Sequence, residues 1–257
     1  MNSYAETAQH LVTDVRIAIS LCTRLPIGPS AETSGGDVAR ASWAFPVAGL
    51  VVGLFGAGAY WLASRAHVPP LPASGLAIAA TILVTGAMHE DGLADTADGL
   101  GGGKSREQKL EIMRDSRIGT YGACALVISL MLRWSALAEI ADPRLVTIAL
   151  ISAHMSARAA LPVFMSLVPS AREDGLSTSA GRPPPQSAVI AVVLGTICLF
   201  VGVGPRGAMV GLLTLSLIGL LLAALAKAQI GGQTGDVLGA IEQTGEAAVL
   251  LIAASLL

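Results

Sequence analysis

Residues 72–103 read PASGLAIAATILVTGAMHEDGLADTADGLGGG, and this stretch indicates the class of fold. Its first part, residues 72–89, is apolar and long enough to cross a lipid bilayer as a helix. Four carboxylates follow within nine positions: Glu90, Asp91, Asp95 and Asp98. Because charge at the edge of a membrane is costly unless it is neutralised, this junction predicts a membrane helix that ends in a polar site.

The composition of the whole chain is that of a membrane protein. Of its 257 residues, 53% are hydrophobic and only 13% are charged, with a mean hydropathy of +0.67. Soluble domains carry about 25% charged residues. The formal net charge of −2 excludes a general nucleic-acid binder, which would need a strongly basic surface.

Seven apolar stretches reach the length of a membrane span, and proline or glycine punctuates most of the gaps. They lie at residues 43–66, 72–89, 120–142, 144–168, 187–204, 207–228 and 236–257. Residues 8–27 are apolar but interrupted by charge, which predicts an amphipathic helix at the interface or against the bundle. We therefore expect an all-α polytopic membrane helix bundle of about seven transmembrane helices plus an N-terminal amphipathic helix. It forms a single integral-membrane domain over residues 1–257.

The first span carries a signal for close helix packing. Gly49 and Gly53 are four residues apart, which is the spacing of small residues that lets another helix approach the backbone. Upstream of this span the chain lacks a charged segment followed by an apolar one and a small-residue cleavage site. We therefore expect no cleaved targeting peptide.

Lysine and arginine are distributed unevenly between the two sides of the predicted bundle. If residues 90–119 are cytoplasmic, eleven of these residues lie on that side and three on the other. The eleven are Arg16, Arg24, Arg40, Lys104, Arg106, Lys109, Arg114, Arg117, Arg172, Arg182 and Lys227. The positive-inside rule therefore places the acidic cluster on the cytoplasmic side.

Asp91, Asp95 and Asp98 indicate a metal site. On helix geometry of about 100° per residue, they fall within roughly 60° of one face. Mg²⁺ is held by one or two carboxylates together with water and substrate phosphates, so three acids in register suit it. The alternative is an acidic helix cap or a solvated loop.

A basic, glycine-rich segment follows the acids. Three glycines at 101–103 precede Lys104 and Arg106, and Arg114 and Arg117 lie shortly before the next span. Glycine allows close approach of a ligand to the backbone, and basic side chains hold phosphate oxygens. An acidic metal site beside this basic segment therefore suits a substrate that contains a pyrophosphate. The alternative is an ordinary positive-inside loop with ion pairs between neighbouring turns.

A second set of charged residues lies in and near the last span. Asp236 could be the N-cap of this helix or a contact to metal or substrate. Glu242 and Glu246 lie one to two turns further along, inside the bilayer, where a carboxylate needs a partner, and we assign Glu242 a substrate contact. Arg158, in the span 144–168, has the same need, which a carboxylate or an anionic ligand could meet.

Two further ionisable residues have candidate roles. His89 stands beside the acids, where it could act as a base or as a structural hydrogen-bonding residue. Arg133, in the span 120–142, could extend its side chain to the interface or pair with Glu139.

Several runs of this sequence resemble one known family, the membrane-bound cobalamin synthases, which are adenosylcobinamide-GDP ribazoletransferases. The two most specific runs are HEDGLADTADGL at 89–100 and EIMRDSRIGTYG at 111–122. The similarity continues in RLP at 24–26, AFPVAG at 44–49 and GQTGDVLGA at 232–240. It therefore covers almost the whole chain. Glu90 departs from the family pattern, in which an apolar residue precedes the aspartate.

The resemblance implies a Mg²⁺-dependent transferase of the bacterial inner membrane, with its active site facing the cytoplasm. It would join adenosylcobinamide-GDP to α-ribazole or α-ribazole 5′-phosphate and release GMP, late in assembly of the nucleotide loop of vitamin B12. The three aspartates would hold the metal on the pyrophosphate, while Arg114 and Arg117 balance the charge of the departing GMP. A nearby carboxylate or His89 would take the proton of the attacking hydroxyl.

Two other functions compete with this one. A CDP-alcohol phosphotransferase also carries several aspartates in one membrane segment, but its Asp-Gly is followed by Ala-Arg, whereas Ala94 here precedes Asp95. A transporter would place charges near the bilayer midplane between inverted repeats, whereas here the densest charge lies at one face. The expected partners are small-molecule substrates and the lipid bilayer, with no nucleic acid. The sequence leaves a homo-oligomer open.

Overall fold

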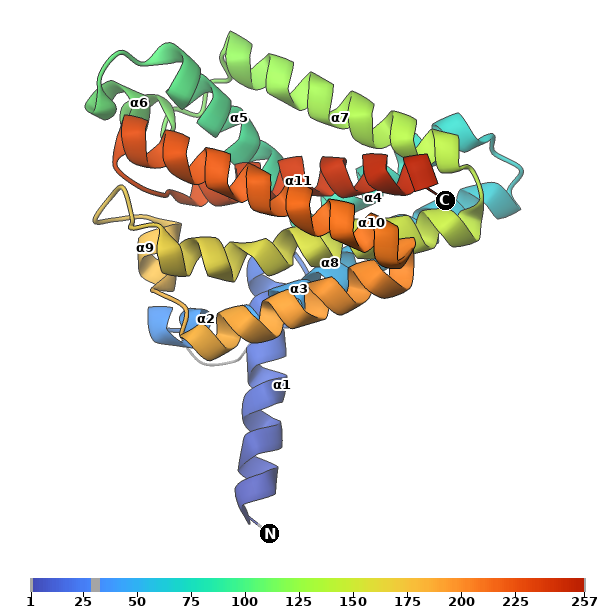
Figure 1. The fold of residues 1–257 in the computed structure, drawn as a ribbon, viewed down its shortest axis with the longest axis horizontal. Coiled ribbons are helices and arrows are strands. Elements are labelled where there is room, and N and C mark those ends of the chain that lie inside the picture. The colour runs from blue at the N-terminus through green and yellow to red at the C-terminus, as the bar shows by residue number, and fades with distance from the viewer. Residues whose placement is uncertain (1, 29–32, 257) are drawn as a thin grey trace.

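The computed structural model describes residues 2–28 and 33–256, and all regular elements in these ranges are helices (Figure 1). They are α1 (Asn2–Cys22), α2 (Gly35–Ala41), α3 (Phe45–Arg65), α4 (Pro70–Thr85), α5 (Met88–Gly102), α6 (Arg106–Ile112), α7 (Thr120–Ile140), α8 (Pro143–Leu167), α9 (Leu176–Ala180), α10 (Pro185–Ile230) and α11 (Gly235–Leu256). A 3₁₀ turn, Ser42–Ala44, links α2 to α3. α8 is the central helix, because it packs against α3, α10 and α11.

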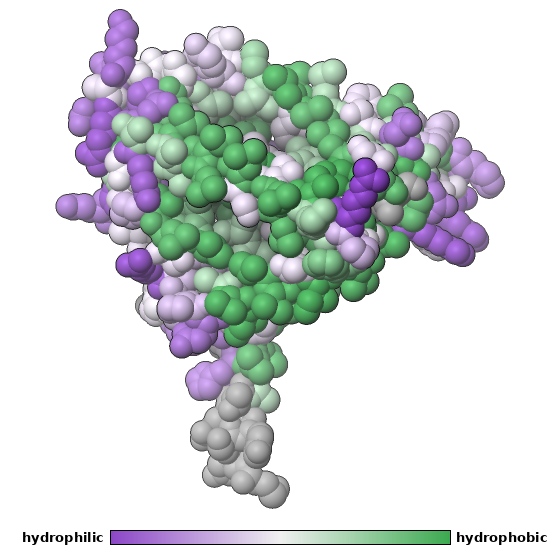
Figure 2. Space-filling model, viewed as in Figure 1, coloured by the Kyte–Doolittle hydropathy of each residue, from purple (hydrophilic) through white to green (hydrophobic). Residues whose placement is uncertain are grey.

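The surface is that of a protein that lies in a bilayer. Five of the described helices are long and apolar enough to cross a membrane, and α4 with α5 makes a sixth if the bent pair counts as one span. Figure 2 shows hydrophobic side chains over the middle of the molecule and hydrophilic ones gathered at its two ends. An apolar belt between two polar ends is expected of a membrane protein. The predicted all-α, polytopic membrane bundle is therefore confirmed.

α10 consists of two membrane helices joined by a sharp break. As one straight helix its 46 residues would be about 69 Å long, over twice the hydrocarbon thickness of about 30 Å. Gly204, with φ 73° and ψ 174°, interrupts the helix just before Pro205. Figure 1 shows that the chain reverses direction at this break, so that the second half returns toward the end of the molecule where the first half began. The break separates the predicted spans 187–204 and 207–228, and each of the seven predicted spans lies largely within helix.

The predicted span 72–89 extends too far at its C-terminal end. α4 stops at Thr85 because Gly86 adopts a left-handed conformation with φ 67°, and α5 then runs at 89° to α4. This bend places His89 and Glu90 inside the bundle, where they are buried. The following aspartates are carried along α5 toward the polar end of the molecule that also holds α6 (Figure 1).

Gly49 and Gly53 let α3 pack closely on α8, as the spacing predicts. A Cβ on Gly49 would clash with the carbonyl oxygen of His154, and one on Gly53 would lie 3.0 Å from Ile151 Cα. Two backbones approach this closely only where neither helix has a side chain in between. The close contact fixes the register of α3 against the central helix.

We expect Gly49→Ala to destabilise the protein by about 1–3 kcal/mol, because the added methyl group forces α3 and α8 apart. Gly58→Ala is the matched control on the same helix, since a Cβ there meets no atom within 4 Å. Alanine at position 58 should leave stability unchanged or raise it slightly. Thermal unfolding in detergent micelles measures both variants, and equal midpoints would contradict the close contact.

The N-terminal segment forms a helix, as predicted, and one buried carboxylate anchors it. Asp14 accepts hydrogen bonds from Arg40 Nε and Trp43 Nε1, both at 3.0 Å. The N-terminal part of α1 extends away from the bundle at a steep angle to the long helices (Figure 1), and Leu11 and Val12 are exposed there. Its position at a membrane interface stays a prediction.

Candidate active site

A cavity of about 220 Å³ lies where α5 and α11 meet, beside the predicted acids. His89 and Asp91 line it from α5, and Asp236 lines it from α11. Residues of α1, α3 and α8 supply apolar walls. A cavity that combines carboxylates with apolar walls suits a ligand that has both a charged and an apolar part.

Three carboxylates from two helices lie in electrostatic range of one another, and two of them, Asp91 and Asp236, line this cavity. α5 and α11 cross closely, because a Cβ on Gly92 would lie 2.8 Å from the Asp236 carbonyl oxygen and 3.1 Å from Gly239 Cα. The crossing brings Asp236 within electrostatic range of Asp91 and Asp95. Asp91 is exposed and Asp95 is half-buried, so both side chains can reach a ligand.

Asp236 is not the cap of α11, which decides one alternative that the sequence leaves open. Thr234 Oγ1 accepts the backbone N–H of Val237 at 3.3 Å, so Thr234 is the capping residue. The same hydroxyl donates to Asp236 Oδ2 at 3.1 Å. The Asp236 carboxylate is therefore available to the cluster of acids.

The Asp98 carboxylate forms hydrogen bonds with the backbone at the start of α7. Its two oxygens accept backbone hydrogen bonds from Gly119 at 2.7 Å and from Gly122 at 2.9 Å. The carboxylate is buried, and the first amides of a helix stabilise a negative charge. The alternative of an acidic helix cap therefore fits Asp98, and its role as a metal ligand stays a prediction.

Substitutions at Asp98 separate these two roles. As a cap, Asp98→Ala should lower the free energy of unfolding by about 2–4 kcal/mol, because two hydrogen bonds to a charged acceptor are lost. Asp98→Asn keeps one acceptor oxygen and should lose less stability, with turnover within about tenfold of wild type. Thermal unfolding and a turnover assay measure both effects. A stable Asp98→Asn protein without turnover would instead support the ligand role.

Arg172, in the loop after α8, is a cation of the site that the sequence analysis missed. Its Nη2 donates to Leu110 O at 2.9 Å and lies 3.9 Å from Asp236 Oδ2. Its buried Nε has no hydrogen-bond partner among the described residues. Burial lowers the pKa of this guanidinium from its ordinary value, and the negative charge of Asp236 partly opposes this shift. No local pattern marks Arg172, because its contacts come from α6 and α11.

Arg106, predicted to bind phosphate, holds two segments of the chain together. Its Nε donates to Ile230 O at 2.9 Å, and its Nη2 donates to Ala171 O at 2.8 Å. These bonds connect α6 to the end of α10 and to the loop that carries Arg172. The contacts favour a structural role for Arg106, and its contact to phosphate stays a prediction.

The other three predicted phosphate ligands are exposed at the polar end. Arg114 pairs with Asp174, and Arg117 Nε donates to Asp115 Oδ1 at 3.0 Å. Hydrogen bonds from Arg117 hold the pKa of Asp115 below its usual range. Lys104 is exposed as well. Exposed ion pairs are weak and exchange readily, so all three cations remain able to meet an anion, and this role stays a prediction.

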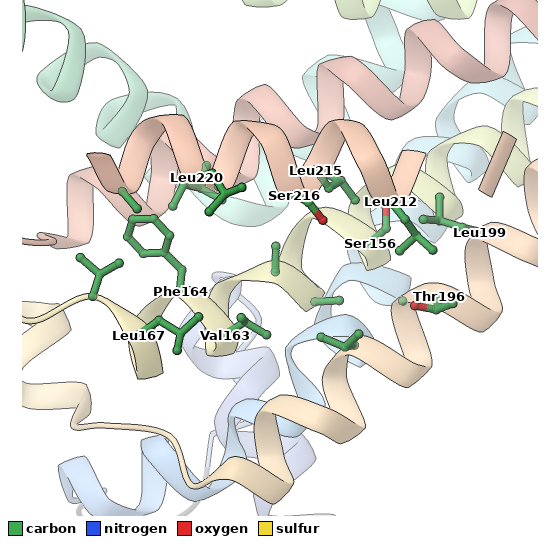
Figure 3. Close-up of a pocket in the computed structure, with 18 of the residues that line it drawn as sticks. Ser156, Val163, Phe164, Leu167, Thr196, Leu199, Leu212, Leu215, Ser216 and Leu220 are labelled. Atoms are coloured by element: carbon green, nitrogen blue, oxygen red, sulfur yellow. The ribbon is translucent and has the colours of Figure 1, made fainter. Parts of the chain in front are cut away.

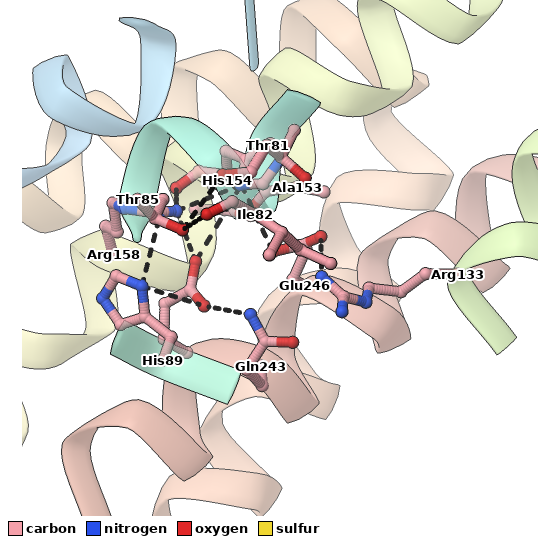
Figure 4. A network of polar contacts seen from close by, with 12 residues as sticks. Thr81, Ile82, Thr85, His89, Arg133, Ala153, His154, Arg158, Gln243 and Glu246 are labelled. Atoms are coloured by element: carbon pink, nitrogen blue, oxygen red, sulfur yellow. Dashed lines mark hydrogen bonds and ion pairs between the residues drawn. The ribbon is translucent and has the colours of Figure 1, made fainter. Parts of the chain in front are cut away.

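A buried network of charged side chains lies behind the cavity wall (Figure 4). Arg158 donates to the Glu242 carboxylate and to His154 Nδ1, the latter at 3.1 Å. Gln243 Nε2 donates to the other Glu242 oxygen at 3.0 Å. Arg158 and Glu242 therefore pair inside the bundle, while Arg158 Nε has no partner among the described residues. The substrate contact predicted for each stays a prediction.

The same network contains a second arginine. Arg133 Nη1 donates to Glu90 Oε1 at 3.2 Å and to Glu246 Oε1 at 3.1 Å. The predicted pairing of Arg133 with Glu139 is therefore wrong, because the inward face of α7 offers two buried carboxylates from other helices. This contact also gives Glu90, whose identity departs from the family pattern, a structural partner.

Three residues of the network could in principle hold a metal. Ligand atoms of His154, Glu242 and Glu246 lie within 4.8 Å of one another. The guanidinium of Arg158 already contacts two of these residues, however. Two neighbouring cations repel strongly in an interior of low dielectric constant. We therefore assign the positive charge of this cluster to arginine.

A larger cavity, of about 460 Å³, lies between α8 and the two halves of α10 (Figure 3). Apolar residues line most of it, together with the hydroxyls of Ser156, Thr196 and Ser216, and Lys227 is the one charged residue among the described residues that line it. It has no carboxylate that could hold a cation. The carboxylates that could hold a cation therefore lie at the smaller cavity, where α5 and α11 meet.

Comparison with known proteins agrees with the motifs. The family described as cobalamin-5-phosphate synthase matches residues 14–254. A protein of Bradyrhizobium diazoefficiens named adenosylcobinamide-GDP ribazoletransferase is 62% identical over 250 residues, which cover 97% of this chain and 96% of that protein. Proteins with the same name from Mesorhizobium japonicum and Azorhizobium caulinodans are 49% and 42% identical, over 95% and 94% of this chain and 94% and 95% of their own lengths. No solved structure matches the chain.

Proposed function

The chain belongs to the cobalamin-5-phosphate synthase family, as an enzyme of cobalamin synthesis, and we propose that it joins adenosylcobinamide-GDP to α-ribazole or its 5′-phosphate and releases GMP. The observation that carries the proposal is a cavity lined by Asp91 and Asp236, with the Asp95 carboxylate in electrostatic range of both and Arg172 Nη2 lying 3.9 Å from Asp236 Oδ2. Oxygen ligands beside a cation are what a pyrophosphate substrate requires.

The acids at this cavity fit Mg²⁺. Asp91, Asp95 and Asp236 provide hard oxygen ligands, and neither Asp91 nor Asp95 has a side-chain hydrogen bond among the described residues. Mg²⁺ held by these carboxylates would supply a Lewis acid that reduces the negative charge of a phosphate group. Sequence periodicity alone selects Asp98 as the third acid, whereas the crossing of α5 and α11 favours Asp236.

Side chains of the protein bind the substrate, stabilise charge and accept the proton in the remaining steps. Arg172 would place its positive charge beside Asp236 and a bound phosphate group and stabilise the charge that develops there. Lys104, Arg114 and Arg117 would hold the guanosine-side phosphate from the exposed end of the site. The ribazole hydroxyl attacks the cobinamide-side phosphorus in line. A new phosphorus–oxygen bond forms, the bond to the bridging oxygen breaks, and the electron pair leaves with GMP. The hydroxyl proton passes to a neighbouring carboxylate or to His89.

We place the reaction on the cytoplasmic side of the bacterial inner membrane. The excess of Lys and Arg on the side of the acids supports this orientation.

The direct test is GMP release by the purified protein in liposomes. With adenosylcobinamide-GDP, α-ribazole 5′-phosphate and Mg²⁺, we expect GMP and the joined product in equal amounts. Removal of Mg²⁺ with a chelator should stop the reaction, and omission of the acceptor should leave only background release. GMP release that does not depend on an acceptor would contradict a transferase and indicate a hydrolase.

A further inference from the structure

The ring of His89 is held between the cavity and the buried network. His89 Nδ1 lies 3.4 Å from Arg158 Nη2 and 3.8 Å from Glu242 Oε2. Figure 4 shows this nitrogen facing the network and the other ring nitrogen, Nε2, pointing away from it. His89 is 4% exposed, yet it lines the cavity together with Asp91 and Asp236. The Nδ1 edge of the imidazole is therefore held by the network, and the Nε2 edge points away from it.

The contact with Arg158 determines which ring nitrogen carries the proton. A guanidinium has only donors, so Nδ1 of His89 must accept in this hydrogen bond. A neutral imidazole that accepts at Nδ1 carries its hydrogen on Nε2. The geometry points to an Nε2–H donor on His89, held in place by Arg158, that binds a phosphate oxygen of the substrate.

This inference rests on the proposed function and gives His89 a different role from that of a base. A nitrogen that already bears hydrogen cannot take the proton of the attacking hydroxyl, so that proton passes to a carboxylate of the cluster. A donor aimed at a phosphate oxygen stabilises the charge that develops there as the bridging bond breaks. Arg158 touches no substrate in this arrangement and is a positioning residue.

The Arg158 side chain is itself well fixed for this task. Its Nη1 contacts the Glu242 carboxylate and His154 Nδ1, which leaves Nη2 directed at His89. All of these groups are buried, so water does not compete for the contacts. The network thus acts as a rigid support for one imidazole.

Three variants separate a donor from a base. His89→Ala removes the donor, and we expect kcat to fall about 10²- to 10³-fold with a smaller change in KM. His89→Gln places an amide N–H near the position of Nε2 but cannot act as a base, so kcat should stay within about tenfold of wild type. Arg158→Lys keeps the charge beside Glu242 but loses the second terminal nitrogen of the guanidinium, which contacts His89. We therefore expect kcat to fall about tenfold. This last loss should vanish in the His89→Ala background, since Arg158 acts through His89.

GMP release at saturating and limiting substrate measures kcat and KM, and thermal unfolding shows that each variant is folded. A His89→Gln protein as inactive as His89→Ala would overturn the donor assignment in favour of a base. Equal losses from Arg158→Lys with and without His89 would show that Arg158 acts on the fold alone. Failure of the wild-type protein to release GMP would instead refute the proposed function, so the two outcomes are distinct.

Discussion

Asp95→Asn is expected to lower kcat for GMP release by about 10³-fold or more while the protein still inserts and folds. The substitution keeps the size of the side chain but removes the charge that would hold the cation at the centre of the site. Loss of several kcal/mol of charge stabilisation in the transition state corresponds to a change of this size. Asp95 is half-buried, and the negative charges of Asp91, Asp236 and Asp98 act on it.

The matched control is Asp115→Asn, which removes a carboxylate that pairs with Arg117 in the exposed basic segment. It should change kcat by no more than about twofold, as is usual for surface substitutions. Both variants are assayed in liposomes over a series of Mg²⁺ concentrations. Normal turnover by Asp95→Asn at low Mg²⁺ would refute the assignment of this carboxylate to the metal.

Arg172→Ala should lower kcat by about 10²- to 10³-fold, the usual cost of removing one donor that stabilises a developing oxyanion. Its Nη2 lies 3.9 Å from Asp236 Oδ2, which places the positive charge of the guanidinium beside the acids. Arg172→Lys retains the charge but not the planar fork, and we expect it to recover only part of the loss. Asp236 would lose its nearby cation in the alanine variant, so the apparent affinity for Mg²⁺ should rise.

Arg182→Ala is the control for Arg172, because Arg182 lies in the next part of the same loop region and donates to Ser166 O. Its turnover should match wild type within about twofold. Steady-state GMP release and Mg²⁺ titration compare the two variants. Equal kinetics for Arg172→Ala and wild type would remove Arg172 from the site.

Local patterns are enough to predict much of this architecture. A run of apolar residues long enough to cross a bilayer must form a helix there, because every backbone group needs an internal hydrogen bond. The same reasoning predicts the break at Gly204 and Pro205, and the spacing of Gly49 and Gly53 predicts a close helix contact. The cluster of acids on one helical segment and the basic segment beside it also follow from the order of residues along the chain.

Partners of the charged residues could not be predicted in this way. Arg133 meets Glu90 and Glu246, which lie 43 and 113 residues away, instead of the nearby Glu139. Helical periodicity states which side of a helix a residue occupies, but it does not state which helix lies opposite. That depends on crossing points such as Gly92 against Gly239.

Length, hydropathy and periodicity are local properties, and they suffice to identify a membrane-embedded helical bundle with an acidic segment at one end. Which acids act together depends on the packed bundle. In the packed bundle, Asp98 accepts a hydrogen bond from the start of α7, and the crossing of α5 and α11 places Asp236 near the other acids. Arg172, from a loop, lies beside Asp236. This is so because the site forms where helices cross, and each crossing is set by contacts between residues far apart in the chain.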